Sequence, residues 1–353
     1  MTLRAPGPIR FDRHEVSGAL GDLGTFVPLF VGLAQRGLVA PGAALLAAGL
    51  ANVATGLAFG LPMAVQPMKA IAALALAGAL DATEVATAGL VTSAVVVALA
   101  ATGALDVVVR RLPRALVRGV QLAVALRLAR SGFALVTSSH TWGGFTGLGV
   151  AIAAFALTAA LLQVRRVPAA LVTFGLGLAW TLATRGSSSE PSAAPIASHA
   201  ARLALGPPVW RAAAAQLPLT LLNSVLAPCA LAAELFPGRA PSPRRVAWSV
   251  GAMNVVSLAL GGMPLCHGAG GLAGQYRFGA RTGGSVVLLG AAMIALGAGA
   301  AASAYQVLAA YPRNVLGVLV LFAALELGQV VLRARGRALL VAVATGLLLD
   351  AIS

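Results

Sequence analysis

The sequence has very little charge. Of its 353 residues only 10% are charged and 10 are acidic, whereas 59% are hydrophobic. Soluble domains carry about 25% charged residues, so this composition excludes an ordinary soluble fold, whose surface needs more charge. Apolar runs long enough to cross about 30 Å of hydrocarbon, at about 1.5 Å of helix rise per residue, recur along the whole chain. These runs predict an all-α polytopic membrane protein.

The chain also lacks the residue sets that build disulfides, metal sites and catalytic centres. Its two cysteines, Cys229 and Cys266, both lie in apolar stretches, so no disulfide framework is indicated. Cys266 and His267 are adjacent but have no companions at metal-ligand spacing. No nucleophile stands beside a base in any recognisable pattern. We therefore expect no cofactor, no bound metal and no enzymatic activity.

The net charge of +15 comes from arginines in short gaps between apolar runs. This placement follows the positive-inside rule and argues against nucleic acid as the partner. The N-terminal stretch "MTLRAPGPIRFDRHE" has no apolar core of its own and predicts no signal peptide. We expect a multi-pass protein of the inner (plasma) membrane with a cytoplasmic N-terminus. The predicted inner gaps then hold Arg4, Arg10, Arg13, Arg110, Arg111, Arg114, Arg118, Arg165, Arg166, Arg239, Arg244, Arg245, Arg277, Arg281, Arg333, Arg335 and Arg337.

The hydrophobic segments fall into two halves joined by a polar loop rich in Ser, Pro and Ala. We assign residues 1–185 to a first repeat, 186–211 to the connecting loop and 212–353 to a second repeat. The first repeat has seven segments and the second has six. They lie near 15–35, 40–60, 64–80, 84–104, 113–129, 146–163 and 168–185, and near 212–235, 244–262, 264–280, 284–302, 312–329 and 338–352.

Two segments are broken in the same way, one in each half. "GLPMAVQPMKAIAALALAG" (60–78) and "GGMPLCHGAGGLAGQY" (261–276) each begin with Gly and Pro and then carry a polar residue. Aligning Pro62 with Pro264 gives an offset of 202 and brings Gln66 near His267. Because seven spans separate the two copies, they have opposite orientations. This predicts an inverted-topology repeat.

The first segment of each half is interrupted as well. Under the same offset Asp22 matches Ser224, which stands beside Asn223. Unpaired backbone survives at membrane depth only inside protein or against a watery cavity. Each broken segment is therefore predicted to be a short extended piece followed by a half-helix. Two half-helix N-termini aimed at one point would form an anion site.

In the first broken segment we expect Pro67 to open the half-helix, and in the second, glycines let a ligand approach the backbone. The alternative is a pair of ordinary kinked helices with small-residue packing faces. "GAGGLA" (268–273) formally fits a dinucleotide-binding pattern, but it lacks the soluble strand–turn–helix setting, so we exclude it.

Several ionisable residues stand inside predicted spans, where charge is costly. Lys69, the only lysine, lies in the first turn of the first half-helix and needs an anionic partner, unless it snorkels to an interface. Asp22 and Glu326 are candidates for a coupling proton, or each pairs with an arginine. His267 either lines a cavity or is hydrogen-bonded to backbone. Arg277 and Arg281 are better explained as inner-loop charges than as ligand contacts.

At these residues the sequence resembles the molybdate transporters of bacteria and plants, relatives of the sulfate permeases. The resemblance rests on four stretches: "GALGDLGTFVPLFVGLA" (18–34), "PMAVQPMKAIAA" (62–73), "QLPLTLLNSVLAPCALAAELFP" (216–237) and "PLCHGAGGLAGQYRFGARTGG" (264–284).

The resemblance implies the inverted seven-plus-seven repeat shared with uracil permeases, with about 12 to 14 membrane segments. It implies a core domain (segments 15–104 and 212–302) and a gate domain (segments 113–185 and 312–353). Substrate then sits between the two broken helices. The implied binding residues are Gln66, Pro67, Met68, Lys69, His267, Gly268, Ala269 and Gly270, and we add Asn223 as a candidate.

The resemblance implies a secondary active transporter that imports a tetrahedral oxyanion by alternating access. Molybdate is the first choice, and sulfate or tungstate the second. Proton or sodium co-transport would drive import of a dianion. There are two rival interpretations. One is a bicarbonate or nucleobase transporter of the same fold, and the other is an anion channel. A homodimer is left open, because the six segments of the second half put the last gate helix in doubt.

Overall fold

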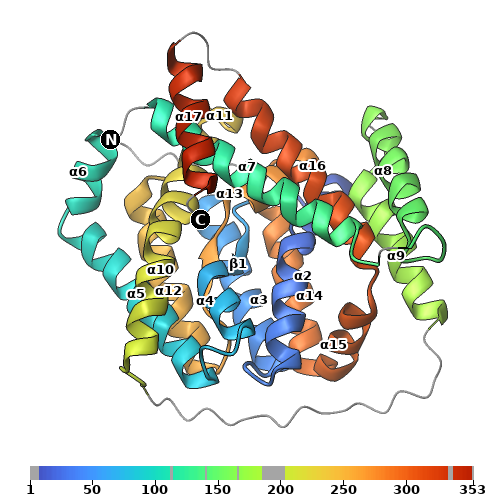
Figure 1. Cartoon of the computed structure of the whole chain (residues 1–353), viewed down its shortest axis with the longest axis horizontal. Coiled ribbons are helices and arrows are strands. Elements are labelled where there is room, and N and C mark those ends of the chain that lie inside the picture. The colour runs from blue at the N-terminus through green and yellow to red at the C-terminus, as the bar shows by residue number, and fades with distance from the viewer. Residues whose placement is uncertain are drawn as a thin grey trace.

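The computed structural model of the chain describes residues 8–111, 114–139, 141–164, 167–184, 203–332 and 337–351. Most of the predicted connecting loop 186–211 lies outside the described residues, as do Arg4, Arg165, Arg166, Arg333 and Arg335. The described chain is almost entirely helical (Figure 1). The first half contains α1 (Arg13–Ala19), η1 (Leu20–Asp22), α2 (Leu23–Gln35), α3 (Pro41–Phe59), β1 (Val65–Pro67), α4 (Lys69–Leu76), α5 (Ala82–Ala101), α6 (Ala104–Arg111), α7 (Arg114–Val136), α8 (Leu148–Gln163) and α9 (Ala169–Thr184).

The second half contains α10 (Pro207–Leu219), η2 (Thr220–Leu226), α11 (Ala227–Leu235), α12 (Pro243–Ala259), β2 (Leu265–His267), α13 (Ala269–Arg277), α14 (Gly284–Gly299), α15 (Ala301–Ala310), α16 (Arg313–Leu332) and α17 (Arg337–Ala351). Most of these elements lie within the predicted segments. The helices α6 and α15 fall in gaps that were predicted between segments, and α7 runs seven residues beyond the predicted end at 129.

Many helices are long and apolar enough to cross a bilayer. Among the described residues, five helical stretches are long and apolar enough to be membrane spans. The pair α14 and α15, which is bent by 117°, forms a sixth if it is taken as one span. Large apolar side chains face outward; Leu57, Leu176 and Val255 are each more than half exposed. Such faces need hydrocarbon rather than water around them. The chain is a multi-pass membrane protein.

The two halves repeat one another with an offset of 200. β1 and β2 pair antiparallel, and Gln66 opposite Cys266 is the central pair. Each strand leads into a half-helix, α4 at Lys69 and α13 at Ala269. The offset of 202 predicted from Pro62 and Pro264 is therefore wrong by two residues. Strand pairing sets the register, and the two prolines stand at different distances before their strands.

The first segment of each half is broken at the equivalent place. A 3₁₀ turn, η1, interrupts α1 and α2 at residues 20–22, and the π-helical η2 separates α10 from α11 at residues 220–226. The amide of Ala227 donates to the carbonyl of Leu222, five residues back, which is the π pattern. Such local changes of helix type concentrate at functional sites. The predicted breaks in the first and third segments of each half are confirmed.

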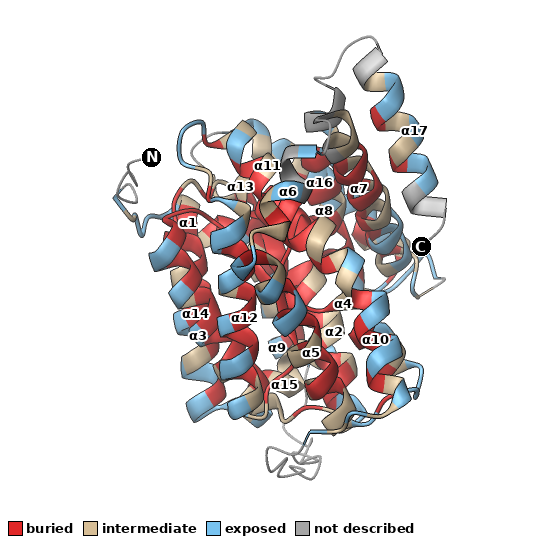
Figure 2. Ribbon diagram, turned by 90° about the vertical axis from the view of Figure 1, so that its left-hand side faces the viewer, coloured by how far each residue is buried: buried red, intermediate tan, exposed pale blue. Residues whose placement is uncertain are grey.

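For description we keep the two groups of helices that the resemblance implies. The core group consists of α1 to α5 with η1 and β1, and α10 to α14 with η2 and β2. Its main contacts are α3 with α14 and the equivalent α5 with α12. In the gate group (α7, α8, α9, α16 and α17), α7 lies along both α16 and α17 (Figure 1). Figure 2 shows buried residues filling the interior of the core group, while α17 stands at one edge.

Glycines bring α3 and α14 into close contact. Gly42, Gly49 and Gly56 recur every seven residues and face Gly297, Gly290 and Gly283 in antiparallel order. A Cβ on Gly49 would stand 2.7 Å from the carbonyl oxygen of Gly290. The absence of side chains thus lets the two backbones touch, as small residues commonly do between membrane helices.

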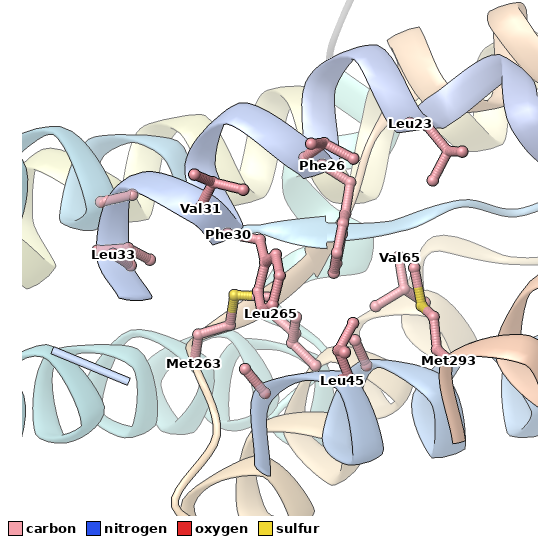
Figure 3. Packing of buried hydrophobic residues seen from close by; sticks show 14 of the residues in the cluster. Leu23, Phe26, Phe30, Val31, Leu33, Leu45, Val65, Met263, Leu265 and Met293 are labelled. Atoms are coloured by element: carbon pink, nitrogen blue, oxygen red, sulfur yellow. The ribbon is translucent and has the colours of Figure 1, made fainter. Parts of the chain in front are cut away.

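Apolar side chains enclose the two strands. Figure 3 shows Phe26 and Phe30 of α2 on one side and Leu45 of α3 on the other, with Val65 and Leu265 of the strands between them. The two phenyl rings stack at 5.8 Å between centroids. This packing fixes the strands, and with them the start of each half-helix, at the centre of the core group.

Candidate functional site

A cavity of about 290 Å³ lies between the core and gate groups. Its core side is formed by α2, α4, α10, η2 and β2. Its gate side is formed by one face of α7. It is lined by Gly24, Thr25, Pro28, Leu29, Lys69, Val124, Arg127, Leu128, Ser131, Leu135, Gln216, Leu219, Asn223, Ser224 and Cys266.

Two cations line this cavity from opposite sides. Lys69 is the first residue of α4 in the core group, and Arg127 lies in the middle of α7 in the gate group. None of the described lining residues is acidic. Cations in a partly apolar enclosure attract anions strongly, because the surroundings screen charge less than bulk water does. The cavity is therefore suited to a small anion.

Polar groups from the π-helical η2 add hydrogen-bonding capacity. Asn223 and Ser224 both line the cavity, and the buried Oδ1 of Asn223 has no hydrogen-bond partner. A buried amide oxygen without a partner is costly unless a ligand or water supplies a donor. Thr25 of α2, Ser131 of α7 and Cys266 of β2 also line the cavity.

Gln216 occupies the start of the half-helix α4. Its Oε1 accepts the amide of Ala70 at 2.8 Å and that of Ile71 at 3.4 Å, and its Nε2 donates to Thr220. These amides are among the first N–H groups of α4, which no helical carbonyl can satisfy. A side chain from the other half thus caps this helix, so these two amides are already hydrogen-bonded and are not available to a ligand in the cavity.

Asp22 and Gln66 form a buried polar cluster behind Thr25. Oδ1 of Asp22 accepts from Oγ1 of Thr25 at 2.7 Å and from Nε2 of Gln66, which also donates to Thr25. Oδ2 of Asp22 and Oε1 of Gln66 are buried without hydrogen-bond partners. Gly268 and Gly271 leave room for the cluster, since a Cβ on Gly271 would stand 2.6 Å from Asp22 Oδ1. An unsatisfied carboxylate oxygen such as Oδ2 of Asp22 can accept a proton or a cation.

His267 faces away from the cavity. Its Nδ1 lies 3.2 Å from the carbonyl of Ala64 and its Nε2 lies 3.1 Å from Ser249 Oγ. The ring also meets Phe59 edge-on at 5.9 Å. The hydrogen bond to backbone that we considered as the alternative role is thus present, and the side chain does not line the cavity.

The other predicted binding residues form the frame of the site. Pro67 ends β1 instead of opening α4, because Met68 takes the cap position and donates its amide to Pro264. In α13, Gly268 is the N-cap, followed by Ala269 and Gly270. A Cβ on Gly270 would collide with Leu128, a lining residue of α7. The N-terminus of α13 therefore lies behind Leu128, beside the cavity.

Glu326 lies apart from this site. It is buried in α16 and its Oε2 is 3.5 Å from Nη1 of Arg277, at the end of α13. The arginine pairing considered as its alternative role is therefore present. Asp22, in contrast, has no arginine among its hydrogen-bond partners.

A neighbouring cavity lies toward one face of the protein. A second cavity of about 130 Å³ shares Pro28 and Leu135 with it and extends past Gln35 and Arg313. These last residues lie at the end of α2 and the start of α16. This is the face that the sequence predicts to be outside.

Sequence reasoning missed Arg127 and Gln216. Arg127 stands in the apolar stretch "QLAVALRLARSGFALV" (121–136), and an arginine inside a span is a signal of function. The predicted segment ends at 129, two residues after Arg127, whereas α7 continues to Val136. Gln216 had no such signal, because only the folded chain brings it to α4.

Comparison with known proteins agrees with this arrangement. The family model described as "Molybdate transporter of MFS superfamily" matches residues 14–128 and 208–327. The chain is 37% identical to molybdate transporter 2 of Arabidopsis thaliana, covering 93% of this chain and 80% of the relative. It is 34% identical to molybdate transporter 1 of that plant (89% and 79%) and 33% identical to molybdate transporter 1 of Chlamydomonas reinhardtii (91% and 84%).

A solved structure shows the same fold. The transmembrane domain of a cyanobacterium bicarbonate transporter, BicA, matches with a TM-score of 0.57 and 16% identity, covering 98% of this chain and 97% of that one. At this identity the likeness establishes the architecture and not the substrate. The family match and the three relatives show the family: the chain belongs to the molybdate transporter family.

Proposed function

We propose that the protein is a secondary active transporter that carries molybdate across the cytoplasmic membrane. The observation that carries this proposal is the cavity lined by Lys69 and Arg127, with no acidic residue among its described lining. A tetrahedral dianion needs positive charge and several hydrogen-bond donors, and the cavity offers both. Family membership favours molybdate over sulfate, tungstate and bicarbonate.

On the core side, Lys69 supplies the charge, and Asn223 and Ser224 supply donors. The ammonium group has three donors and no acceptor, and the Asn amide and Ser hydroxyl can each point a hydrogen at an oxyanion. Gln216 accepts hydrogen bonds from the amides of Ala70 and Ile71 at the start of α4, so these two amides are not available to the anion. The half-helix acts on the anion through its dipole and by positioning Lys69. The remaining candidate residues support the site without lining the cavity: Gln66, Pro67, Met68 and residues 267–270.

Transport follows from movement of the core group against the gate group. The second cavity adjoins the site on the side of the predicted outer face, and two ion pairs join the core and gate groups at the opposite face. We propose that the structure is the state that receives the anion from outside. The N-terminus is then cytoplasmic.

Import of a dianion works against an inside-negative potential, which costs about 2.3 kcal/mol per charge per 100 mV. A co-transported proton or sodium ion would offset this cost. Asp22 is the better-placed carrier, since its Oδ2 is buried and has no hydrogen-bond partner, whereas Glu326 is held by Arg277.

The test is molybdate uptake into liposomes containing the purified protein, with Lys69→Gln and a surface control, Arg211→Gln. We expect saturable uptake by the wild type and by the control, and uptake reduced at least about tenfold by Lys69→Gln, because a hydrogen bond to a charged group is worth about 1.5–3 kcal/mol. Stronger competition by sulfate or bicarbonate than by unlabelled molybdate would reassign the substrate. Sustained single-channel currents would replace the transporter with a channel.

A further inference from the structure

Five residues of α7 line the cavity, and they form one face of that helix. They occupy successive turns, with an adjacent pair, Arg127 and Leu128, three and four residues after Val124. They are Val124, Arg127, Leu128, Ser131 and Leu135. Arg127 is the one charged residue in this set. A charged side chain within a 23-residue span is expensive unless it lines a watery cavity or pairs inside the protein.

Lys69 lines the same cavity from the other helix group. Like charges that share an enclosure of low dielectric raise the free energy of the empty site. Asp22 lies nearby and attracts Lys69, but its Oδ1 accepts from Thr25 and Gln66 and the residue does not line the cavity, so no described lining residue carries negative charge. An anion between Lys69 and Arg127 would remove this repulsion, and a dianion would neutralise both cations.

We propose that Arg127 is a direct ligand of the transported oxyanion, supplied by the gate group, and that it selects dianions over monoanions. This inference rests on the proposed function and names the class of ligand at the same site. A guanidinium presents a planar fork of donors that matches two oxygens of a tetrahedral oxyanion. The anion is then bound by Lys69 on one group and by Arg127 on the other.

This arrangement also explains how substrate binding favours movement. When the cavity is empty, the two cations oppose close approach of the core and gate groups across the site. A bound dianion turns that repulsion into attraction on both sides. Bound anion therefore favours the closed site through which alternating access must pass, and a monoanion does so less.

The experiment compares tungstate with perrhenate, a tetrahedral monoanion of nearly the same size. Binding to purified protein is measured by calorimetry for the wild type, Arg127→Gln, Arg127→Lys and a control, Arg130→Gln. Arg130 is exposed, lies one turn further along α7 and does not line the cavity. The ratio of the two affinities separates loss of charge from general damage to the site.

We expect Arg127→Gln to weaken tungstate binding by about 10- to 100-fold, as loss of a charged hydrogen bond does, and perrhenate binding by clearly less. Arg127→Lys keeps the charge, so it should keep the preference for tungstate while losing affinity for both anions. Arg130→Gln should match the wild type.

Equal weakening of both anions in Arg127→Gln, or no weakening, overturns the inference. If that variant does not fold, Arg127→Lys decides: unchanged affinity for both anions means that the arginine fork is not a ligand. Failure of the proposed function looks different, because the wild type would then bind neither anion and Lys69→Gln would change nothing.

Discussion

Arg277 and Glu326 join the two helix groups. Nη1 of Arg277, the last residue of α13, lies 3.5 Å from Oε2 of Glu326 in α16. A second pair makes the same kind of connection: Nη2 of Arg118 in α7 lies 3.6 Å from Oε1 of Glu234 in α11. Both pairs lie at the same end of the molecule, where α7, α11, α13 and α16 meet (Figure 2). This is the predicted inner face.

We predict that these pairs hold the inner face closed. Replacing Glu326 and Glu234 together with Gln should favour the inward-open state. Each partly exposed pair is worth about 1 kcal/mol or less, so the double variant is needed for a clear effect. Hydrogen–deuterium exchange at the C-terminal ends of α11 and α13 should then be faster in the double variant than in the wild type. Added molybdate should slow this exchange less in the variant than in the wild type.

The charge-reversed variant Arg277→Glu with Glu326→Arg is the matched control. It should restore part of the protection, because the pair is re-formed in the opposite sense. Exchange that stays at the wild-type level in the double Gln variant would show that apolar packing alone closes this face.

Cys266 provides an internal reporter of the cavity. It lines the cavity, whereas the other cysteine, Cys229, is buried elsewhere in the core group. We predict that a small anionic thiol reagent, methanethiosulfonate ethylsulfonate, modifies Cys266 and leaves Cys229 intact, because the cations of the cavity attract the sulfonate. Intact-mass and peptide-mass analysis measure this. Molybdate should slow the reaction, and Cys266→Ser should abolish it. Modification of Cys229 first would place the accessible cavity elsewhere.

The sequence predicts most of the fold because the membrane restricts it so strongly. Long apolar runs can only be spans, and glycine with proline inside such a run breaks the helix. The two broken segments and their inverted relation are therefore visible in the sequence. Their register is not, because it depends on the pairing of Gln66 with Cys266 across 200 residues, which leaves no local pattern.

The site is less predictable, since its contacts are made by residues far apart in the chain. Lys69 and Asn223 were expected, and both line the cavity. Gln216 reaches α4 only through tertiary packing, and Glu15 accepts the amides of Thr282 and Ser285 near the start of α14 in the same way. His267 seemed a ligand because it is polar and follows a break, but both ring nitrogens are paired behind the site.

A third prediction separates the two candidate coupling carboxylates. Asp22→Asn should preserve exchange of labelled for unlabelled molybdate but remove accumulation driven by an imposed proton or sodium gradient. The reason is that an amide cannot take up a proton or neutralise a cation at Oδ2, which has no other partner. Liposome uptake with and without each gradient measures the difference and identifies the coupling ion.

Glu326→Gln is the comparison for that experiment. Since Glu326 is paired with Arg277, we expect it to change the rate of transport and to leave gradient-driven accumulation in place. The opposite result, loss of accumulation in Glu326→Gln alone, would move the coupling site from η1 to α16.

The last prediction concerns the glycine contact between α3 and α14. Gly49→Ala places a Cβ 2.7 Å from the carbonyl oxygen of Gly290, so backbones that now touch must separate. Overpacking of this kind costs about 1–3 kcal/mol, and we expect a lower midpoint of thermal unfolding in detergent. Gly175→Ala in α9 is the matched control, because a Cβ there meets nothing within 4 Å. The control should be neutral or slightly stabilising, since alanine is the better helix former. If both variants unfold at the same temperature, the backbones of α3 and α14 are not in the close contact described above, and the core group tolerates a looser packing.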